Sequence, residues 1–127
     1  MDKRKVLVLG ASEKEERYSN MAIKSLLRNG FSVVAMGNRE GETQGVQIHK
    51  EIGDVQNEIA NEELDTLTLY LGPKNQSQLP ELIKELNPKR IIFNPGTENS
   101  EMYKFLNELK IPYEEACTLV LLNIKEF

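Results

Sequence analysis

Three small residues in a row form the feature of this chain best suited to chemistry: Gly10, Ala11 and Ser12. They follow an apolar run at 6–9 that is typical of a strand buried on both faces of a parallel sheet. Ser19 and Asn20 are predicted to start the helix after this turn. Backbone N–H groups, the Ser12 hydroxyl and the positive end of the helix dipole then meet at one spot. The sequence therefore predicts a site for an anion, most often a phosphate.

Two basic residues of the same loop, Lys14 and Arg17, are candidate partners for that phosphate. An Arg guanidinium binds phosphate oxygens through two parallel hydrogen bonds. The same side chains can instead pair on the surface with the neighbouring acids Glu13, Glu15 and Glu16. The sequence favours neither arrangement.

The end of the second predicted strand narrows the class of ligand. The dinucleotide fingerprint is absent, because Ser12 and Glu15 stand where its second and third glycines would be. NAD-binding folds usually place an acid after this strand to bind the ribose hydroxyls. This chain has a neutral and basic run instead: Gly37, Asn38 and Arg39. The run suits a ribose that carries a phosphate, as in NADP or coenzyme A, with Arg39 either on that phosphate or exposed in a turn.

No nucleophile–base pair or carboxylate dyad is evident, so we expect no catalytic residue. The single histidine, His49, and the single cysteine, Cys117, argue against a metal site and an internal disulfide. Cys117 stands at a predicted helix start, where a thiolate would be stabilised. Packing as a small buried residue is the favoured alternative.

Strand and helix patterns alternate along the chain and must position these residues. Strands are predicted at 6–9, 31–36, 46–48, 66–71, 91–93 and 111–113. Helices are predicted after Ser19, after a cap at Ser77, around 102–109 and over 117–124. This order predicts a three-layer, Rossmann-like, doubly wound α/β fold with a mainly parallel sheet of about five strands. Ligands of such folds bind beyond the carboxyl ends of the strands.

Length and charge set further bounds. A chain of 127 residues is predicted to form one domain, 1–127, and no apolar run is long enough to span a membrane. The net charge of −4 argues against general nucleic-acid binding. Residues 1–50 nevertheless hold nine basic and six acidic residues, which suits a small polyanion. The lack of a signal peptide and the single cysteine predict a cytoplasmic location.

Five segments carry a resemblance to a known family over nearly the whole chain: 8–12, 17–21, 68–71, 89–99 and 115–122. The most specific parts are Asn-Pro-Gly-Thr-Glu-Asn at 94–99 and Glu-Ala-Cys-Thr-Leu-Val at 115–120. The sequence resembles the small single-domain CoA-binding proteins, which are similar to the N-terminal domain of the succinyl-CoA synthetase alpha subunit.

The resemblance implies a Rossmann-like fold that binds coenzyme A or an acyl-CoA. It implies that the turn and the helix start at Ser19 and Asn20 meet the diphosphate. It implies that the loop after 66–71 flanks the adenosine or the pantetheine arm: Leu71, Gly72 and Pro73. It implies that a further loop closes the site: Asn94, Pro95 and Gly96. The related synthetase domain holds CoA while other domains react, so we expect a carrier, sensor or docking module. The family carries the cysteine at position 117, and the resemblance therefore allows Cys117 a role near the CoA thiol beside the favoured packing role.

The chain departs from the family pattern in two loops. The family usually has proline after the second strand, where this chain has Gly37-Asn38-Arg39, and a Lys-Pro pair where it has Lys14-Glu15. Glu15 would weaken anion binding if its side chain pointed inward. Two alternatives stay open: an NADP-dependent reductase or fragment, and a regulatory module without ligand. A partner enzyme chain, and a monomer or homodimer, are all compatible with the sequence.

Overall fold

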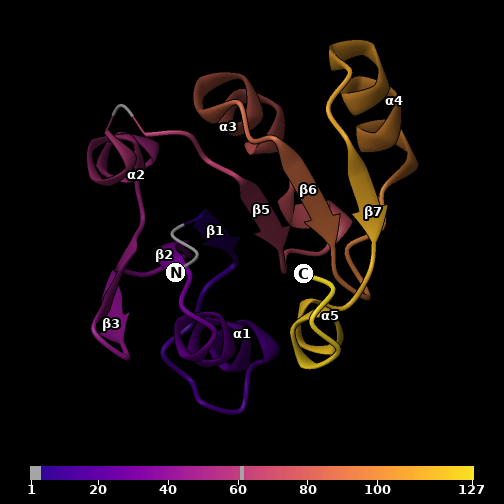
Figure 1. Cartoon of the computed structure of the whole chain (residues 1–127). Helices are drawn as coiled ribbons and strands as arrows, with labels where there is room; N and C mark the ends of the chain where they lie inside the picture. Colours follow the sequence, from indigo (N-terminus) through magenta and orange to yellow (C-terminus); the bar gives the residue numbers. More distant parts are fainter. Residues whose placement is uncertain (1–3, 61) are drawn as a thin grey trace.

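A seven-stranded sheet forms the middle layer, with the strand order β3-β4-β2-β1-β5-β6-β7 (Figure 1). The computed structural model describes residues 4–60 and 62–127. Six strands are parallel to one another: β1 (Lys5–Leu9), β2 (Ser32–Met36), β4 (Val46–His49), β5 (Thr66–Leu69), β6 (Arg90–Phe93) and β7 (Tyr113–Glu115). The predicted Rossmann-like, mainly parallel α/β fold is confirmed, with seven strands in place of about five.

The extra strand comes from a hairpin in the weakly patterned region after β2. β3 (Gly41–Thr43) runs antiparallel to β4, and Gln44 and Gly45 join them with φ of 55° and 81°. Two successive positive φ angles fit the tight turns that match the twist of paired strands. The polar composition of 39–45 hid this strand, because an edge strand needs little apolar burial.

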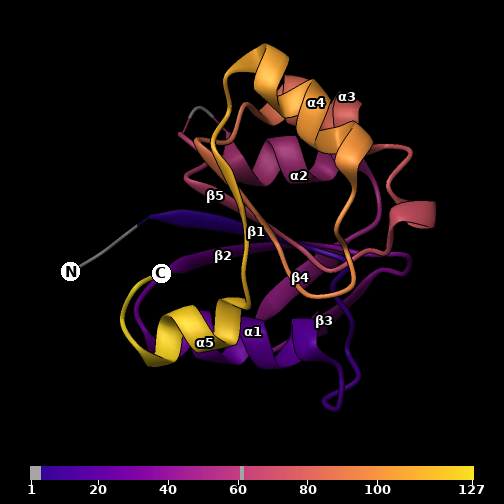
Figure 2. The same cartoon turned by 90° about the vertical axis from the view of Figure 1, so that its right-hand side faces the viewer.

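Helices cover both faces of the sheet (Figure 2). One face carries α1 (Tyr18–Arg28) and α5 (Thr118–Asn123). The other carries α2 (Ile52–Ile59), α3 (Leu79–Leu86) and α4 (Ser100–Leu109). A short 3₁₀ turn, η1 (Pro73–Asn75), follows β5. The sequence pattern predicted α1, α3, α4 and α5 but missed α2, whose buried residues are only Val55 and Ile59.

β1 shows why the strands read as continuous apolar runs. Leu7 and Leu9 belong to the core beneath α2, α3 and α4, whereas Val6 and Val8 belong to the core beneath α1 and α5. All four side chains are at most 4% exposed. Alternate side chains thus enter two separate cores, as expected for a parallel strand covered on both faces.

Two predicted helix starts are wrong by one or two residues. Arg17, not Ser19, is the N-cap of α1, and Gln78, not Ser77, is the N-cap of α3. Neither residue caps through its side chain. In α4 the side chain of Asn99 does cap, accepting hydrogen bonds from the N–H groups of Glu101 and Met102. None of the helices in the described ranges is both long enough and apolar enough to cross a membrane.

Candidate functional site

The carboxyl ends of β1, β2 and β5 meet at one edge of the sheet. The N–H groups of Gly10 and Ala11 both donate to the carbonyl of Met36, each at 2.9 Å. The N–H of Tyr70 donates to the carbonyl of Leu9 at 2.8 Å. These bonds bring together the loops that follow the three strands, as predicted.

Two adjoining hollows open on this edge. The first, of about 450 Å³, we call the turn hollow because Gly10, Ala11 and Ser12 line it. The second, of about 330 Å³, we call the lysine hollow because Lys50 and Lys74 line it. Four residues line both hollows: Gly10, Asn38, Leu71 and Asn75. One extended ligand can therefore occupy both.

Glycine is required at two positions where the loops approach each other. Gly10 has φ of +95°, and a Cβ there would lie 3.0 Å from the carbonyl carbon of Tyr70. A Cβ on Gly37 would lie 2.3 Å from the carbonyl oxygen of Ala11. Any side chain at these positions would push the loops apart. The glycines therefore set the closeness of the three loops.

Five cationic side chains gather at the two hollows. Lys14, Arg17 and Arg39 line the turn hollow, and Lys50 and Lys74 line the lysine hollow. Across residues 4–60 and 62–127, none of the five forms an ion pair with a carboxylate. Such a concentration of unpaired positive charge on an acidic chain suits a small polyanion.

Glu15 of the turn loop lies away from both hollows, whereas Glu13 borders one of them. Glu15 pairs with Lys24 on α1 at 3.2 Å, and its side chain is 76% exposed and lines neither hollow. Glu13 does line the turn hollow, but one of its carboxylate oxygens accepts the N–H of Glu42 on β3 at 3.0 Å. Glu15 thus faces the side of α1, not the predicted anion site.

Tyr70 adds a polar group that the sequence analysis overlooked. It lines the turn hollow, and its buried hydroxyl has no hydrogen-bond partner among the described residues. Burial raises the pKa of Tyr70 to about 12, against smaller lowering effects of Thr118 and Thr68, whose hydroxyls bond to each other. Tyr70 is therefore a neutral phenol at physiological pH.

Asn20 supports the turn from behind. It is fully buried, and its side-chain amide donates to the carbonyl of Ser12 at 2.8 Å and to the hydroxyl of Thr43 at 2.9 Å. Ser19 is also buried, and neither residue lines a hollow. The structure does not place these two side chains at the hollows, because α1 begins two residues earlier than predicted and both side chains are buried.

Asn94 is the centre of a second support. It is 1% exposed, and its amide donates to the Thr68 hydroxyl and the Leu69 carbonyl and accepts the N–H of Thr118 at 2.8 Å. The Thr68 and Thr118 hydroxyls lie 2.7 Å apart. Every polar atom of this amide is thus engaged within the protein, so the structure places Asn94 in a supporting network and not at either hollow.

The structure divides the predicted site residues into two groups. The hollows bring together most of them: Gly10, Ala11, Ser12, Lys14, Arg17, Gly37, Asn38, Arg39, Leu71 and Gly72. The others line neither hollow: Ser19, Asn20, Pro73, Asn94, Pro95, Gly96 and Cys117. Cys117 is half-buried at the start of α5.

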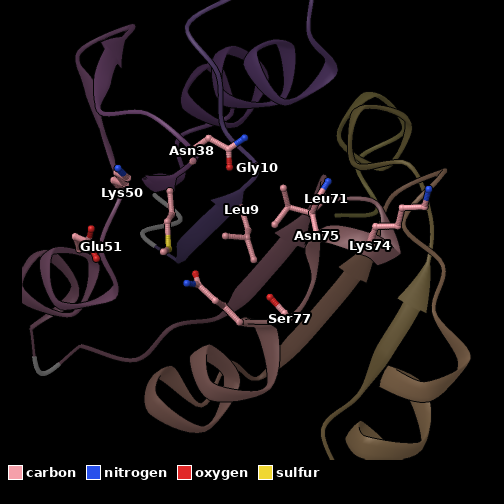
Figure 3. Close-up of a pocket in the computed structure, with 12 residues that line it drawn as sticks. Leu9, Gly10, Asn38, Lys50, Glu51, Leu71, Lys74, Asn75 and Ser77 are labelled. Atoms are coloured by element: carbon pink, nitrogen blue, oxygen red, sulfur yellow. The ribbon is translucent and has the colours of Figure 1, made fainter.

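Several lining residues were not predicted. In the lysine hollow, Lys50 and Glu51 lie on one side, before α2, and Lys74 and Asn75 lie on the other, in η1 (Figure 3). Leu9 and Met36, the last residues of β1 and β2, supply apolar lining. Lys74 could have been predicted from the sequence, because it lies in the loop after the strand predicted at 66–71. Lys50 could not, because it lies just before α2, a helix that the sequence pattern did not predict.

A family model described as "CoA binding domain" matches residues 4–123. The chain belongs to the CoA binding domain family. This membership confirms the resemblance carried by the segments at 94–99 and 115–122, and it supports an association with CoA in general terms. No curated protein matches the sequence.

Solved structures share the fold of this CoA binding domain. An uncharacterized protein is 38% identical, with complete coverage of both chains and a TM-score of 0.88. A conserved hypothetical protein from Pyrococcus furiosus is 24% identical over 91% of this chain and 97% of its own, with a TM-score of 0.75. A dinucleotide-forming acetyl-coenzyme A synthetase 1 from Ca. Korarchaeum cryptofilum, solved with phosphate and ADP, is 13% identical over 86% of this chain and 25% of its own, with a TM-score of 0.68.

Proposed function

We propose that the protein binds coenzyme A or an acyl-CoA across the two hollows, through the 3′-phospho-ADP and the diphosphate. The observation that carries this proposal is the gathering of five unpaired cations around a glycine turn at the carboxyl edge of the sheet. Coenzyme A presents a diphosphate and a ribose 3′-phosphate, so its ADP end needs several positive charges close together.

The diphosphate suits the turn hollow. Gly10 and Ala11 allow close approach to the backbone, and the side chains of Lys14 and Arg17 stand beside them with no carboxylate partner in the described part of the chain. Arg17 is also the N-cap of α1, so the positive end of the helix dipole lies there. These groups together favour a doubly charged diphosphate.

The adenosine suits the lysine hollow. Leu9, Met36 and Leu71 offer apolar contact for the base, while Asn38 lies between the two hollows, where the ribose would join them. Arg39 borders the turn hollow next to Asn38 and suits the 3′-phosphate. The pantetheine arm would then pass Gly72 toward Cys117.

The role we propose is that of a carrier, sensor or docking module that holds CoA for a separate enzyme chain. His49 bonds to Glu58 on α2, and Cys117 has neither histidine nor lysine adjacent in the sequence. The charged groups at the hollows are five cations and the carboxylates of Glu13 and Glu51, and they show no nucleophile paired with a base among the described residues, so we propose that they bind and orient a ligand.

A ligand panel tests the proposal. Thermal shift and isothermal titration are measured with CoA, acetyl-CoA, dephospho-CoA, NADP and NAD. CoA or acetyl-CoA should stabilise the protein most, and Lys14→Ala should weaken that binding about tenfold. Lys104→Ala, at an exposed position on α4, is the matched control and should bind as the wild type does.

Two results would overturn the proposal. Stabilisation by NADP alone would favour a reductase or reductase fragment. No stabilisation by any of the five compounds would favour a regulatory module without ligand.

A further inference from the structure

Exposed apolar side chains are concentrated on one face, away from the hollows. Five large hydrophobic side chains of the described residues are exposed, and four of them lie on or next to α1 and α5: Tyr18 (69%), Met21 (37%), Val120 (54%) and Ile124 (57%). The fifth, Leu109, ends α4 on the opposite side of the sheet. We call the surface of α1 and α5 that carries the four side chains the α1/α5 face.

The α1/α5 face is hollowed. A groove of about 700 Å³ runs between the two helices, which lie side by side below the sheet in Figures 1 and 2. Met21, Ser25 and Arg28 line it from α1, and Val120, Leu122 and Lys125 line it from α5 and its end. It shares no lining residue with the turn hollow or the lysine hollow. The groove therefore belongs to a separate surface.

The geometry points to a second copy of this chain as the occupant, with a two-fold axis perpendicular to α1. Tyr18, Met21, Ser25 and Arg28 are spaced by three, four and three residues, so they share one face of the helix. This spacing reads the same in both directions. An antiparallel pair of α1 helices thus sets Tyr18 opposite Arg28 of the partner subunit, and Met21 opposite Ser25 of the partner subunit.

The facing residues are chemically complementary. Arg28 is exposed and forms no ion pair within residues 4–60 and 62–127, so its guanidinium is available to stack on an exposed tyrosine ring. Ser25 is small, which lets the two helices approach around Met21. The antiparallel arrangement also keeps the Arg28 side chains apart, because it sets Arg28 against Tyr18 of the partner subunit and not against Arg28 of the partner subunit.

The same axis serves α5. Val120 and Ile124 are four residues apart, one helical turn, so reversal of the helix sets Val120 against Ile124 of the partner subunit. Ser25 and Leu122, from the middle of the two helices, line the same groove, so a single axis can pass near both. Apolar contacts between the two α5 helices then add to the polar and aromatic contacts between the two α1 helices.

The size of the face sets the strength of the dimer. α1 has 11 residues and is about 16 Å long, so a face two helices wide is smaller than the roughly 800 Å² that each partner buries in a standard interface. We therefore expect a weak dimer that dissociates on dilution.

Sedimentation velocity from about 1 µM to about 1 mM protein tests the inference. The wild type should move from monomer to dimer across this range, and Val120→Glu should raise the dissociation constant at least tenfold by burying a charge. Leu109→Glu, which puts the same charge at an exposed leucine of α4, is the matched control and should dimerise like the wild type. Unchanged thermal unfolding of both variants shows that they are folded.

Disulfide trapping tests the orientation in a Cys117→Ser background. A mixture of Met21→Cys and Ser25→Cys proteins should cross-link to each other faster than Met21→Cys cross-links to itself, because the antiparallel arrangement sets these two positions opposite each other. A wild type that stays monomeric at all concentrations, a Val120→Glu dimer as tight as the wild type, or faster self-cross-linking of Met21→Cys would each overturn the inference.

Discussion

Two regions at the carboxyl edge of the sheet differ in composition. One is formed by the loops after β1 and β2, and the other by the buried polar residues at the end of β6. The first is lined by glycines, five exposed cations and other side chains that border two open hollows. The second consists of neutral amides and hydroxyls around Asn94, all hydrogen-bonded to one another or to backbone. We call this second region the amide network.

The comparison separates the loops that are proposed to bind ligand from the residues that support those loops. The glycine turn is a weak sequence signal, yet it lines the hollows. The segment at 94–99 is a specific signal, yet its first residue is buried and joins β5, β6 and α5. A residue type can therefore mark a family because the fold depends on it, without lining the hollows. The predictions below challenge this division.

The amide network should carry the largest effect on stability. Asn94→Ala removes three buried hydrogen bonds and leaves the Thr118 N–H without its acceptor. We expect the free energy of unfolding to fall by about 2–4 kcal/mol, because an unsatisfied buried group adds to the lost bonds. Urea denaturation measures the change in the free energy of unfolding, and Asn107→Ala, at an exposed position of α4, is the control. A loss no larger than that of the control would refute the structural role of Asn94.

The loop edge should respond to a single methyl group. Gly37→Ala places a carbon 2.3 Å from the Ala11 carbonyl oxygen, so the loops after β1 and β2 must separate. We expect a loss of about 1–3 kcal/mol in unfolding free energy and weaker CoA binding by titration calorimetry.

A second glycine gives the control for this substitution. Gly53 lies in α2, and a Cβ there would meet nothing within 4 Å. Gly53→Ala should raise the unfolding free energy by about 0.5–1 kcal/mol and leave CoA binding unchanged. Equal effects at the two glycines would show that the close approach of the loops is not what matters at Gly37.

Arg39 should govern the discrimination between CoA and dephospho-CoA and should have little effect on the free energy of unfolding. Its side chain is exposed and forms no ion pair within the described ranges. Arg39→Ala should lower CoA affinity about tenfold, since a charge-assisted hydrogen bond is lost, and should leave the affinity for dephospho-CoA nearly unchanged. Competition titration measures the ratio of the two affinities. A ratio equal to that of the wild type would remove Arg39 from the 3′-phosphate site.

Glu15 should give the smallest effect. Glu15→Gln breaks an exposed ion pair with Lys24, which is worth about 0.5 kcal/mol or less. CoA affinity should change less than threefold, because the carboxylate lies outside both hollows. A tenfold gain in affinity would mean that Glu15 faces the bound phosphate after all.

The sequence by itself determined the fold class and which loops meet at the carboxyl edge of the sheet. Apolar runs and helical spacing are local patterns, and the alternation of strand and helix leaves little choice but a covered parallel sheet. In such a sheet the residues after each strand must lie at one edge, so 10–12, 37–39 and 71–72 were predicted together and line the hollows together. The strand β3 and the helix α2 were not predicted, because both are short and bury few apolar residues.

Only the tertiary structure decided which polar side chains face the hollows and which support them. Asn20 turns inward because Thr43, 23 residues further on, accepts its amide hydrogen. Asn94 is buried because its partners Thr68 and Thr118 lie 26 and 24 residues away. The partners of a polar group are set by chain segments that meet only in the folded protein, whereas the periodicity that predicts strands and helices lies within the segment itself.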